Sequence, residues 1–134
     1  MSSIKDILLI MPPFSMEERY GRGIEKIGTS SPPLGLLYIG AVLEKEGYNV
    51  KIFDTQIDNW NIKKITKPDI VGIYCNTSNY HRALELAQEI KNNFNIPVVF
   101  GGPHVTIRPH EVLRNGQVDY VVVGEGETTL VELL

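Results

Sequence analysis

The sequence is short of the residues that build disulfides and metal sites. Cys75 is the only cysteine among 134 residues. This excludes a disulfide within the chain and any zinc or iron–sulfur site built from several of its own cysteines. No run of 18 apolar residues occurs, and the first apolar stretch, Ile7–Met11, is too short for a signal peptide. We therefore expect a soluble, cytoplasmic protein.

The chain also has no excess of charge and no phosphate-binding motif. Its 13 basic and 16 acidic residues are interspersed and leave a net charge of −3, so we expect no nucleic-acid or membrane partner. Neither GxxxxGK[ST] nor a GxGxxG after the first strand is present, which argues against nucleoside triphosphates and NAD. No Ser/His/Asp triad, paired carboxylates or metal ligands can be assigned. The sequence predicts no catalytic residue and no metal site in this chain.

What the sequence does contain is a series of five short apolar runs, which we interpret as strands. Four are almost continuously hydrophobic, as expected for parallel strands covered by helices on both faces. Val50–Phe53 alternates instead and is the candidate edge strand. The runs are Ile7–Met11, Val50–Phe53, Ile70–Tyr74, Val98–Phe100 and Tyr120–Val123.

Helical periodicity separates most of these strands. Apolar residues at i, i+3, i+4, i+7 and i+8 from Leu34 predict a helix over 33–46, and the same pattern predicts one over 80–94. Arg108–Leu113 is expected to form a shorter helix with Pro109 in its first turn. The connection 56–67 is expected to form only one or two irregular turns, anchored by Trp60, Ile62 and Ile65. A last helix begins after Gly124.

Alternating strands and helices predict an α/β fold of the flavodoxin-like (Rossmann-type) class. We expect a doubly wound, five-stranded parallel sheet of order 2-1-3-4-5, with ligands at the carboxyl ends of strands one, three and four. The apolar pattern of the last helix is still running at Leu134. We therefore expect residues 1–134 to be one domain, truncated within that helix, and Leu130, Leu133 or Leu134 to be exposed and to favour self-association.

Two predicted strand ends carry proline or small polar residues. Pro12, Pro13 and Phe14 follow the first strand and lead into an 18-residue connection, 15–32, which we expect to be either a surface loop or a flap over a ligand. The segment 75–79 follows the third strand. One of Thr77, Ser78 and Asn79 should occupy the N-cap of the next helix, and the same groups can contact a polar ligand. Cys75 itself should be a buried, unreactive residue.

The other two strand ends are rich in glycine. Gly101, Gly102, Pro103 and His104 follow the fourth strand, where paired glycines form a tight turn or allow a flat ligand to approach the main chain. His104 is expected to lie in this loop as a hydrogen-bonding residue. Gly124, Glu125, Gly126 and Glu127 follow the fifth strand. Their carboxylates oppose a phosphate and favour hydroxyl, amide or interdomain contacts, or capping by Glu127.

Taken together, these motifs resemble the N-terminal cobalamin (vitamin B12)-binding domain of the B12-dependent radical S-adenosylmethionine enzymes. The resemblance covers almost the whole chain. It rests on the order and spacing of Pro12-Pro13, PPLGLLYIGAVLE (32–44), GGPH (101–104) and VVGEGE (122–127).

The resemblance implies a flavodoxin-like domain that holds cobalamin across the carboxyl strand ends. It also implies a following barrel with CxxxCxxC, a [4Fe–4S] cluster and S-adenosylmethionine, which this chain lacks, so the fragment alone should not catalyse a reaction. By position, the implied cofactor-binding residues are Pro12, Pro13 and Phe14 beside the nucleotide tail, Asn76, Thr77 and Ser78 facing the corrin or tail, Gly101, Gly102, Pro103 and His104 under its rim, and Gly124, Glu125 and Gly126 on the far side.

The resemblance leaves open how cobalt is bound and whether the cofactor is cobalamin. The first-strand loop has no DxHxxG, the motif that supplies an axial histidine in methionine-synthase-like B12 domains. Two other functions remain for this fold, an interaction module that docks a catalytic domain or subunit, and a domain binding another small cofactor such as FMN. Hydroxyl residues after the first strand would favour an FMN phosphate, and Ser15 alone gives little support.

Overall fold

A computed structural model describes residues 3–13 and 34–134, so Phe14 and the connection that follows it lie outside the described residues. The strands are β1 (Asp6–Met11), β2 (Asn49–Asp54), β3 (Ile70–Tyr74), β4 (Val98–Gly101) and β5 (Tyr120–Val121). The helices are α2 (Leu34–Lys45), the 3₁₀-helix η2 (Ile62–Lys64), α3 (Tyr80–Phe94), α4 (Pro103–Ile107), α5 (Pro109–Leu113) and α6 (Gly126–Leu133).

The five strands form one parallel sheet of order β2-β1-β3-β4-β5, which confirms the predicted topology. β2 lies at an edge, as its alternating pattern indicated. The order reverses between β1 and β3, where Leu9 lies opposite Gly72 and Ile10 opposite Ile73. The carboxyl ends of β1, β3, β4 and β5 therefore meet at one edge of the sheet, where α/β proteins of this class bind ligands.

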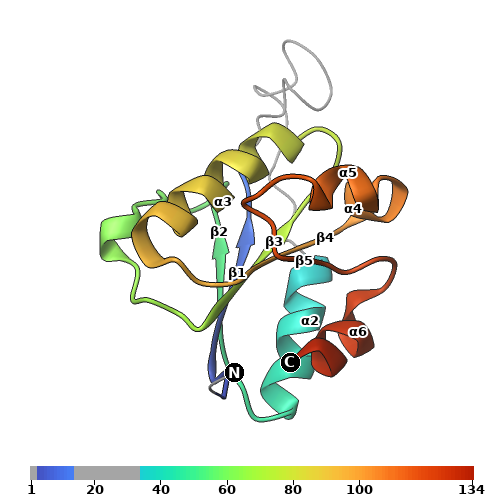
Figure 1. The fold of residues 1–134 in the computed structure, drawn as a ribbon. Coiled ribbons are helices and arrows are strands. Elements are labelled where there is room, and N and C mark those ends of the chain that lie inside the picture. The colour runs from blue at the N-terminus through green and yellow to red at the C-terminus, as the bar shows by residue number, and fades with distance from the viewer. Residues whose placement is uncertain (1–2, 14–33) are drawn as a thin grey trace, which may run out of the picture.

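Helices cover the two faces of the sheet unequally. α3, α4 and α5 lie on one face, and α2 and α6 lie together on the other (Figure 1). Because successive strand residues point to opposite faces, each strand contributes to two separate apolar cores. Leu8, Val71 and Phe100 belong to the core under α3, whereas Leu9 and Val99 belong to the core under α2 and α6.

The fourth strand end differs from its predicted loop. Pro103 begins the short helix α4, and His104 is buried in it at 9% exposure instead of lying in a loop. Gly102 precedes the helix with φ +109°, which turns the chain sharply, and Pro103 at the first helical position is already held near helical φ. The last strand is also shorter than predicted and ends at Val121.

The last helix is packed more closely than we expected. Leu130 is only 7% exposed, and Leu133 and Leu134 are half-buried against the core that α2 shares with α6. Large apolar side chains are exposed elsewhere, among them Leu34 (71%) and Tyr38 (65%) of α2 and Ile107 (71%) of α4. None of the helices in the described ranges is long and apolar enough to cross a membrane.

Candidate functional site

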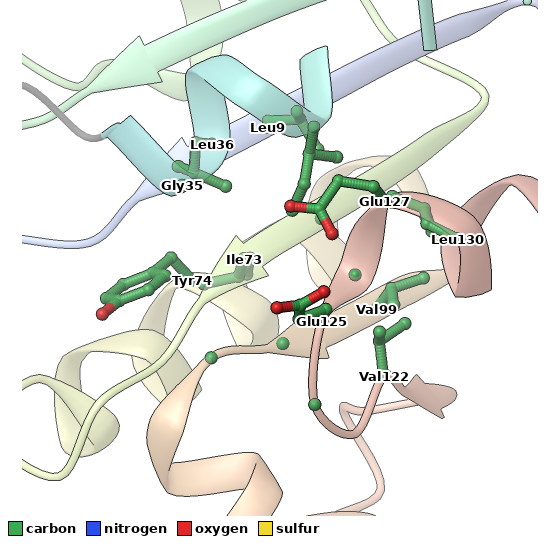
Figure 2. A pocket seen from close by; sticks show the side chains of 16 residues that line it. Leu9, Gly35, Leu36, Ile73, Tyr74, Val99, Val122, Glu125, Glu127 and Leu130 are labelled. Carbon is green, nitrogen blue, oxygen red and sulfur yellow. The ribbon is translucent and has the colours of Figure 1, made fainter. Parts of the chain in front are cut away.

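A cavity of about 220 Å³ opens at the carboxyl edge and extends between the sheet and helices α2 and α6 (Figure 2). Its floor consists of strand residues and its cover of the two helices. The carboxylates of Glu125 and Glu127 reach into the space between α2 and the strands. The lining residues are Leu9, Gly35, Leu36, Ile39, Gly72, Ile73, Tyr74, Val99, Gly101, Gly102, Val122, Gly124, Glu125, Gly126, Glu127 and Leu130.

Glycines shape this cavity in two ways. At Gly72 a Cβ atom would lie 2.8 Å from Leu9 Cδ2, and at Gly126 it would lie 3.1 Å from Ile39 Cδ1. Both positions therefore let apolar walls approach closely. At Gly101 the nearest atom to a Cβ would be Val122 Cβ, 3.9 Å away, so this position leaves space at the mouth of the cavity. The result is a largely apolar slot that is open at its mouth.

Gly102 is required by the backbone as well as lining the cavity. A Cβ atom here would lie 2.5 Å from the carbonyl oxygen of Cys75, and the residue has φ +109° and ψ −178°. This conformation is almost confined to glycine, because it lies outside the left-handed helical region that Asn tolerates. Replacing Gly102, even by Asn, therefore does not separate a ligand contact from a folding requirement.

The loop after β3 is held by a reciprocal pair of asparagines. The Asn76 N–H donates to Asn79 Oδ1, and the Asn79 N–H donates to Asn76 Oδ1, both at 2.8 Å. Asn79 is the N-cap residue of α3, as the sequence allowed, but its side chain does not cap that helix. Thr77 and Ser78 are exposed at the tip of this loop, at the edge of the sheet. The pair thus fixes the loop, with the side chains of Thr77 and Ser78 exposed at its tip.

His104 supports the same loop from below. The imidazole Nδ1 lies 3.2 Å from Thr77 Oγ1, and the ring stacks on Tyr80 with centroids 4.2 Å apart. The main-chain N–H of His104 donates to the Cys75 carbonyl at 3.2 Å. Its Nε2 is buried without a hydrogen-bond partner. These contacts join the end of β4 to the β3–α3 loop, and His104 does not line the cavity.

Cys75 is the first residue after β3. Its side chain is buried, and burial raises the pKa of the thiol to about 12. Its Sγ is a weak donor to the Asn76 carbonyl at 3.7 Å. The thiol therefore stays protonated near neutral pH, as expected for an unreactive packing residue.

The structure brings together five of the sequence-predicted cofactor-binding residues in the cavity, namely Gly101, Gly102, Gly124, Glu125 and Gly126. The remaining described ones lie outside it, and these are Pro12, Pro13, Asn76, Thr77, Ser78, Pro103 and His104. Phe14 is outside the described residues. Glu127, for which capping was one alternative, lies in the first turn of α6, and Glu125 occupies the N-cap without a side-chain hydrogen bond.

Sequence reasoning missed the residues deeper in the cavity. Leu9, Val99 and Val122 were assigned only to strands, and nothing in their pattern distinguishes a cavity wall from a packed core. Gly72 did carry a signal, because an isolated glycine inside a strand often marks a close approach. The missed lining residues are Leu9, Gly35, Leu36, Ile39, Gly72, Ile73, Tyr74, Val99, Val122, Glu127 and Leu130.

Comparisons of the sequence and of the structure with known proteins lead to the same family. Residues 23–134 match the B12 binding domain family. The chain is 39% identical over 98% of its length to an uncharacterized methyltransferase of Pyrococcus horikoshii, and covers 29% of that protein. It is 30% identical over 96% of its length to an anaerobic magnesium-protoporphyrin IX monomethyl ester cyclase of Synechocystis, and covers 27% of it.

A solved structure shares the fold. The radical S-adenosylmethionine methyltransferase TsrM from Kitasatospora setae, with cobalamin and a [4Fe-4S] cluster bound, aligns with a TM-score of 0.75 and 22% identity over 97% of this chain and 26% of TsrM. The chain thus spans less than a third of the length of the proteins to which we compare it. The match of residues 23–134, together with the sheet order and the cavity at its carboxyl edge, shows that this chain belongs to the B12-binding domain family.

Proposed function

We propose that this chain holds cobalamin across the carboxyl ends of its strands, with the nucleotide tail entering the slot between the sheet and helices α2 and α6. The observation that carries the proposal is the shape of the cavity. At about 220 Å³ it is smaller than the roughly 300–1,000 Å³ of pockets that enclose a whole ligand, so it suits one end of a large molecule. The rest of that molecule would lie outside, over the edge of the sheet.

The residues at the edge suit such a ligand. Gly101 and Gly124 present main chain with open space beside it, so a bulky ring can approach closely. Thr77 and Ser78 are exposed and offer hydroxyls to amide groups of a ligand, with Asn76 beside them. Pro12 is fully buried at the end of β1 and Pro13 half-buried. We retain Pro12, Pro13, Phe14 and Pro103 as neighbours of the cofactor by their place in the sequence.

Nothing in the described chain suggests a protein ligand to cobalt. His104 is buried behind Thr77, and the Cys75 thiol is neutral near pH 7. The loop after β1 also lacks the DxHxxG motif. With the nucleotide tail in the slot, its base would be held away from the cobalt, and the residues that the structure describes would supply no histidine in its place. We therefore infer base-off binding.

The activity of the whole protein is the second part of the proposal. Two relatives named above are a methyltransferase and a cyclase, both several times longer than this chain. Cobalamin, when bound, supplies a cobalt that can carry a methyl group. We propose that this domain presents it to a radical S-adenosylmethionine domain in the same polypeptide, which holds the [4Fe–4S] cluster. The cytoplasmic location and the absence of nucleic-acid and membrane partners stay predictions from composition.

Titration with hydroxocobalamin tests the binding directly. In equilibrium dialysis against cobalamin at about 10 μM or above, we expect the purified chain to retain the pigment. The bound pigment should show a base-off spectrum. FMN titrated in parallel should not bind. Binding of FMN alone would favour the alternative cofactor, and binding of neither would favour an interaction module of the same fold.

Gly101→Val is the variant that separates binding from folding. By strand alternation from Val99, position 101 faces the cavity, and the residue has no positive φ. A valine is well tolerated in a strand and would fill the mouth of the slot. We expect a folded protein that loses cobalamin binding at least about tenfold. Ala41→Leu, which adds apolar bulk at an exposed position of α2 outside the cavity, is the control. Unchanged affinity in Gly101→Val would contradict the proposed site.

A further inference from the structure

A second groove lies beside β1 and β2 near their amino ends, away from the cavity at the carboxyl ends of the strands. Its volume is about 460 Å³. It lies where β2 connects to β3 through the short η2, whereas longer helices cover the sheet elsewhere on this face (Figure 1). The lining residues are Asp6, Ile7, Leu8, Asn49, Lys51, Ile52, Phe53, Lys64, Ile65, Thr66, Lys67 and Pro68.

The floor of this groove is apolar. Leu8 and Phe53 belong to the core that α3 covers, and Ile65 packs against the same core from the β2–β3 connection. Trp60 closes the neighbouring part of the face, because its ring meets Phe53 edge-on at 5.1 Å and its Nε1 donates to Glu89 of α3 at 2.5 Å. The groove is therefore the part of this sheet face that the chain's own crossover leaves open.

The rim of the groove is basic. Lys51, Lys64 and Lys67 line it and are exposed, and within the described ranges no ion pair engages any of the three. Two carboxylates lie nearby: Asp6 is part of the lining, and Asp69 feels the charge of Lys67. Asp6 Oδ1 accepts from Asn49 Nδ2 at 2.7 Å, and Asp69 Oδ2 accepts the N–H groups of Lys5 and Asp6 at 2.9 and 2.8 Å. The groove lining, with three lysines and one aspartate, therefore carries an excess of positive charge in a chain of net charge −3.

We propose that this groove docks an acidic, amphipathic helical segment of a partner polypeptide. Apolar side chains of that segment would rest on Phe53 and Ile65, which lie beside the buried Leu8, and its carboxylates would pair with the lysines. Charge complementarity argues for this occupant, since the carboxylates of an acidic segment would meet the excess of lysines in the groove lining. A docked helix would also cover the part of the sheet beside β2, where the chain's own connection provides only the short η2. The groove lies at the amino ends of the strands, so docking leaves the cofactor edge free.

The test is an NMR titration of the ¹⁵N-labelled chain with a synthetic helix-forming peptide that carries leucines on one face and glutamates on the others. We expect shifts confined to groove residues such as Leu8, Lys51 and Thr66. The same peptide with glutamine in place of glutamate should bind more weakly. No groove shifts at about 1 mM peptide, or equal binding of both peptides, would overturn the proposal.

Two lysines that are adjacent in sequence provide a matched pair of variants. Lys64 lines the groove and Lys63 does not, although both are exposed on η2. Lys64→Glu should weaken peptide binding about five- to tenfold, while Lys63→Glu, with the same change of charge, should leave it near wild type. Equal loss in both variants would show that only the overall charge matters and would refute a specific groove.

Two further measurements distinguish other readings. Inorganic pyrophosphate that shifts the same residues and displaces the peptide at similar concentration would identify a small-anion site and overturn the docking proposal. Lys64→Glu should bind hydroxocobalamin as wild type does, because the two sites lie at opposite edges of the sheet. Failure of peptide binding with intact cobalamin binding would therefore reject this inference alone.

Discussion

Gly102 lies so close to Cys75 that a Cβ atom on it would lie 2.5 Å from the carbonyl oxygen and 3.0 Å from the nitrogen of Cys75. The surrounding main chain explains this approach. The Cys75 N–H donates to the Gly101 carbonyl at 2.7 Å, and the Cys75 carbonyl accepts from the His104 N–H at 3.2 Å. The ends of β3 and β4 are thus joined by backbone contacts immediately beside the cavity.

Gly102→Ala should therefore destabilise the chain strongly. The added methyl group must displace main chain, and the positive φ adds backbone strain of about 1–3 kcal/mol. Gly101→Ala is the matched control, since its Cβ would meet only ordinary contacts near 3.9 Å. Urea denaturation should show a lower midpoint for Gly102→Ala and a nearly unchanged one for Gly101→Ala. Equal midpoints would contradict the close approach.

His104→Ala should lower stability by about 1–3 kcal/mol. The substitution removes the stacking on Tyr80 and the contact with Thr77 from a buried site. His110→Ala, at an exposed position of α5, should change stability by no more than about 0.5 kcal/mol. Thermal unfolding of the two variants checks this difference. A stable His104→Ala protein would mean that the imidazole does not support the loop.

Cys75 should make stability fall at high pH. Burial raises the pKa of the folded thiol to about 12 from an ordinary value of 9.0, so the unfolded chain loses its proton first. The unfolded state then binds fewer protons, and the free energy of unfolding declines as pH rises from about 9 to about 12. Cys75→Ala should show a shallower decline over that range in denaturant titrations.

The same burial predicts low reactivity of the thiol. A thiol-labelling reagent should modify Cys75 slowly in the folded chain and rapidly in denaturant. Rapid labelling of the folded protein at neutral pH would contradict the buried position.

Asp69 should make stability fall at low pH. Hydrogen bonds from the Asp6 and Lys5 N–H groups lower the pKa of its carboxyl below the ordinary 3.8, with help from the charges of Lys5 and Lys67. The stabilisation is thus present above about pH 4 and is lost as pH falls through the lower folded pKa. Asp69→Asn should be less stable than wild type at pH 6, and the difference should shrink toward pH 2. Urea denaturation of both proteins across this pH range measures the difference, and a difference that stays constant with pH would contradict the prediction.

Much of the fold could be read from local patterns. The apolar runs predicted every strand, and the alternation in Val50–Phe53 predicted its edge position, because a strand with one less-covered face must alternate. The helical stripe from Leu34 predicted α2 within one or two residues. The glycines at 101, 124 and 126 lie at the carboxyl ends of the strands, where the sequence placed them, and line the cavity there.

The sequence by itself determined the class of fold, the order of the strands and the family, since these depend on periodicity and on motifs in a fixed order. Tertiary structure alone decided which residues share a space. His104 looked like a loop residue because a five-residue helix carries almost no periodic signal, and packing on Tyr80 buries it. Leu9 and Val122 became walls of a cavity, and Lys51 and Lys64 came to share a groove, through the pairing of strands and crossovers far apart in the chain. Such contacts depend on the three-dimensional path of the backbone, which no local pattern of residues records.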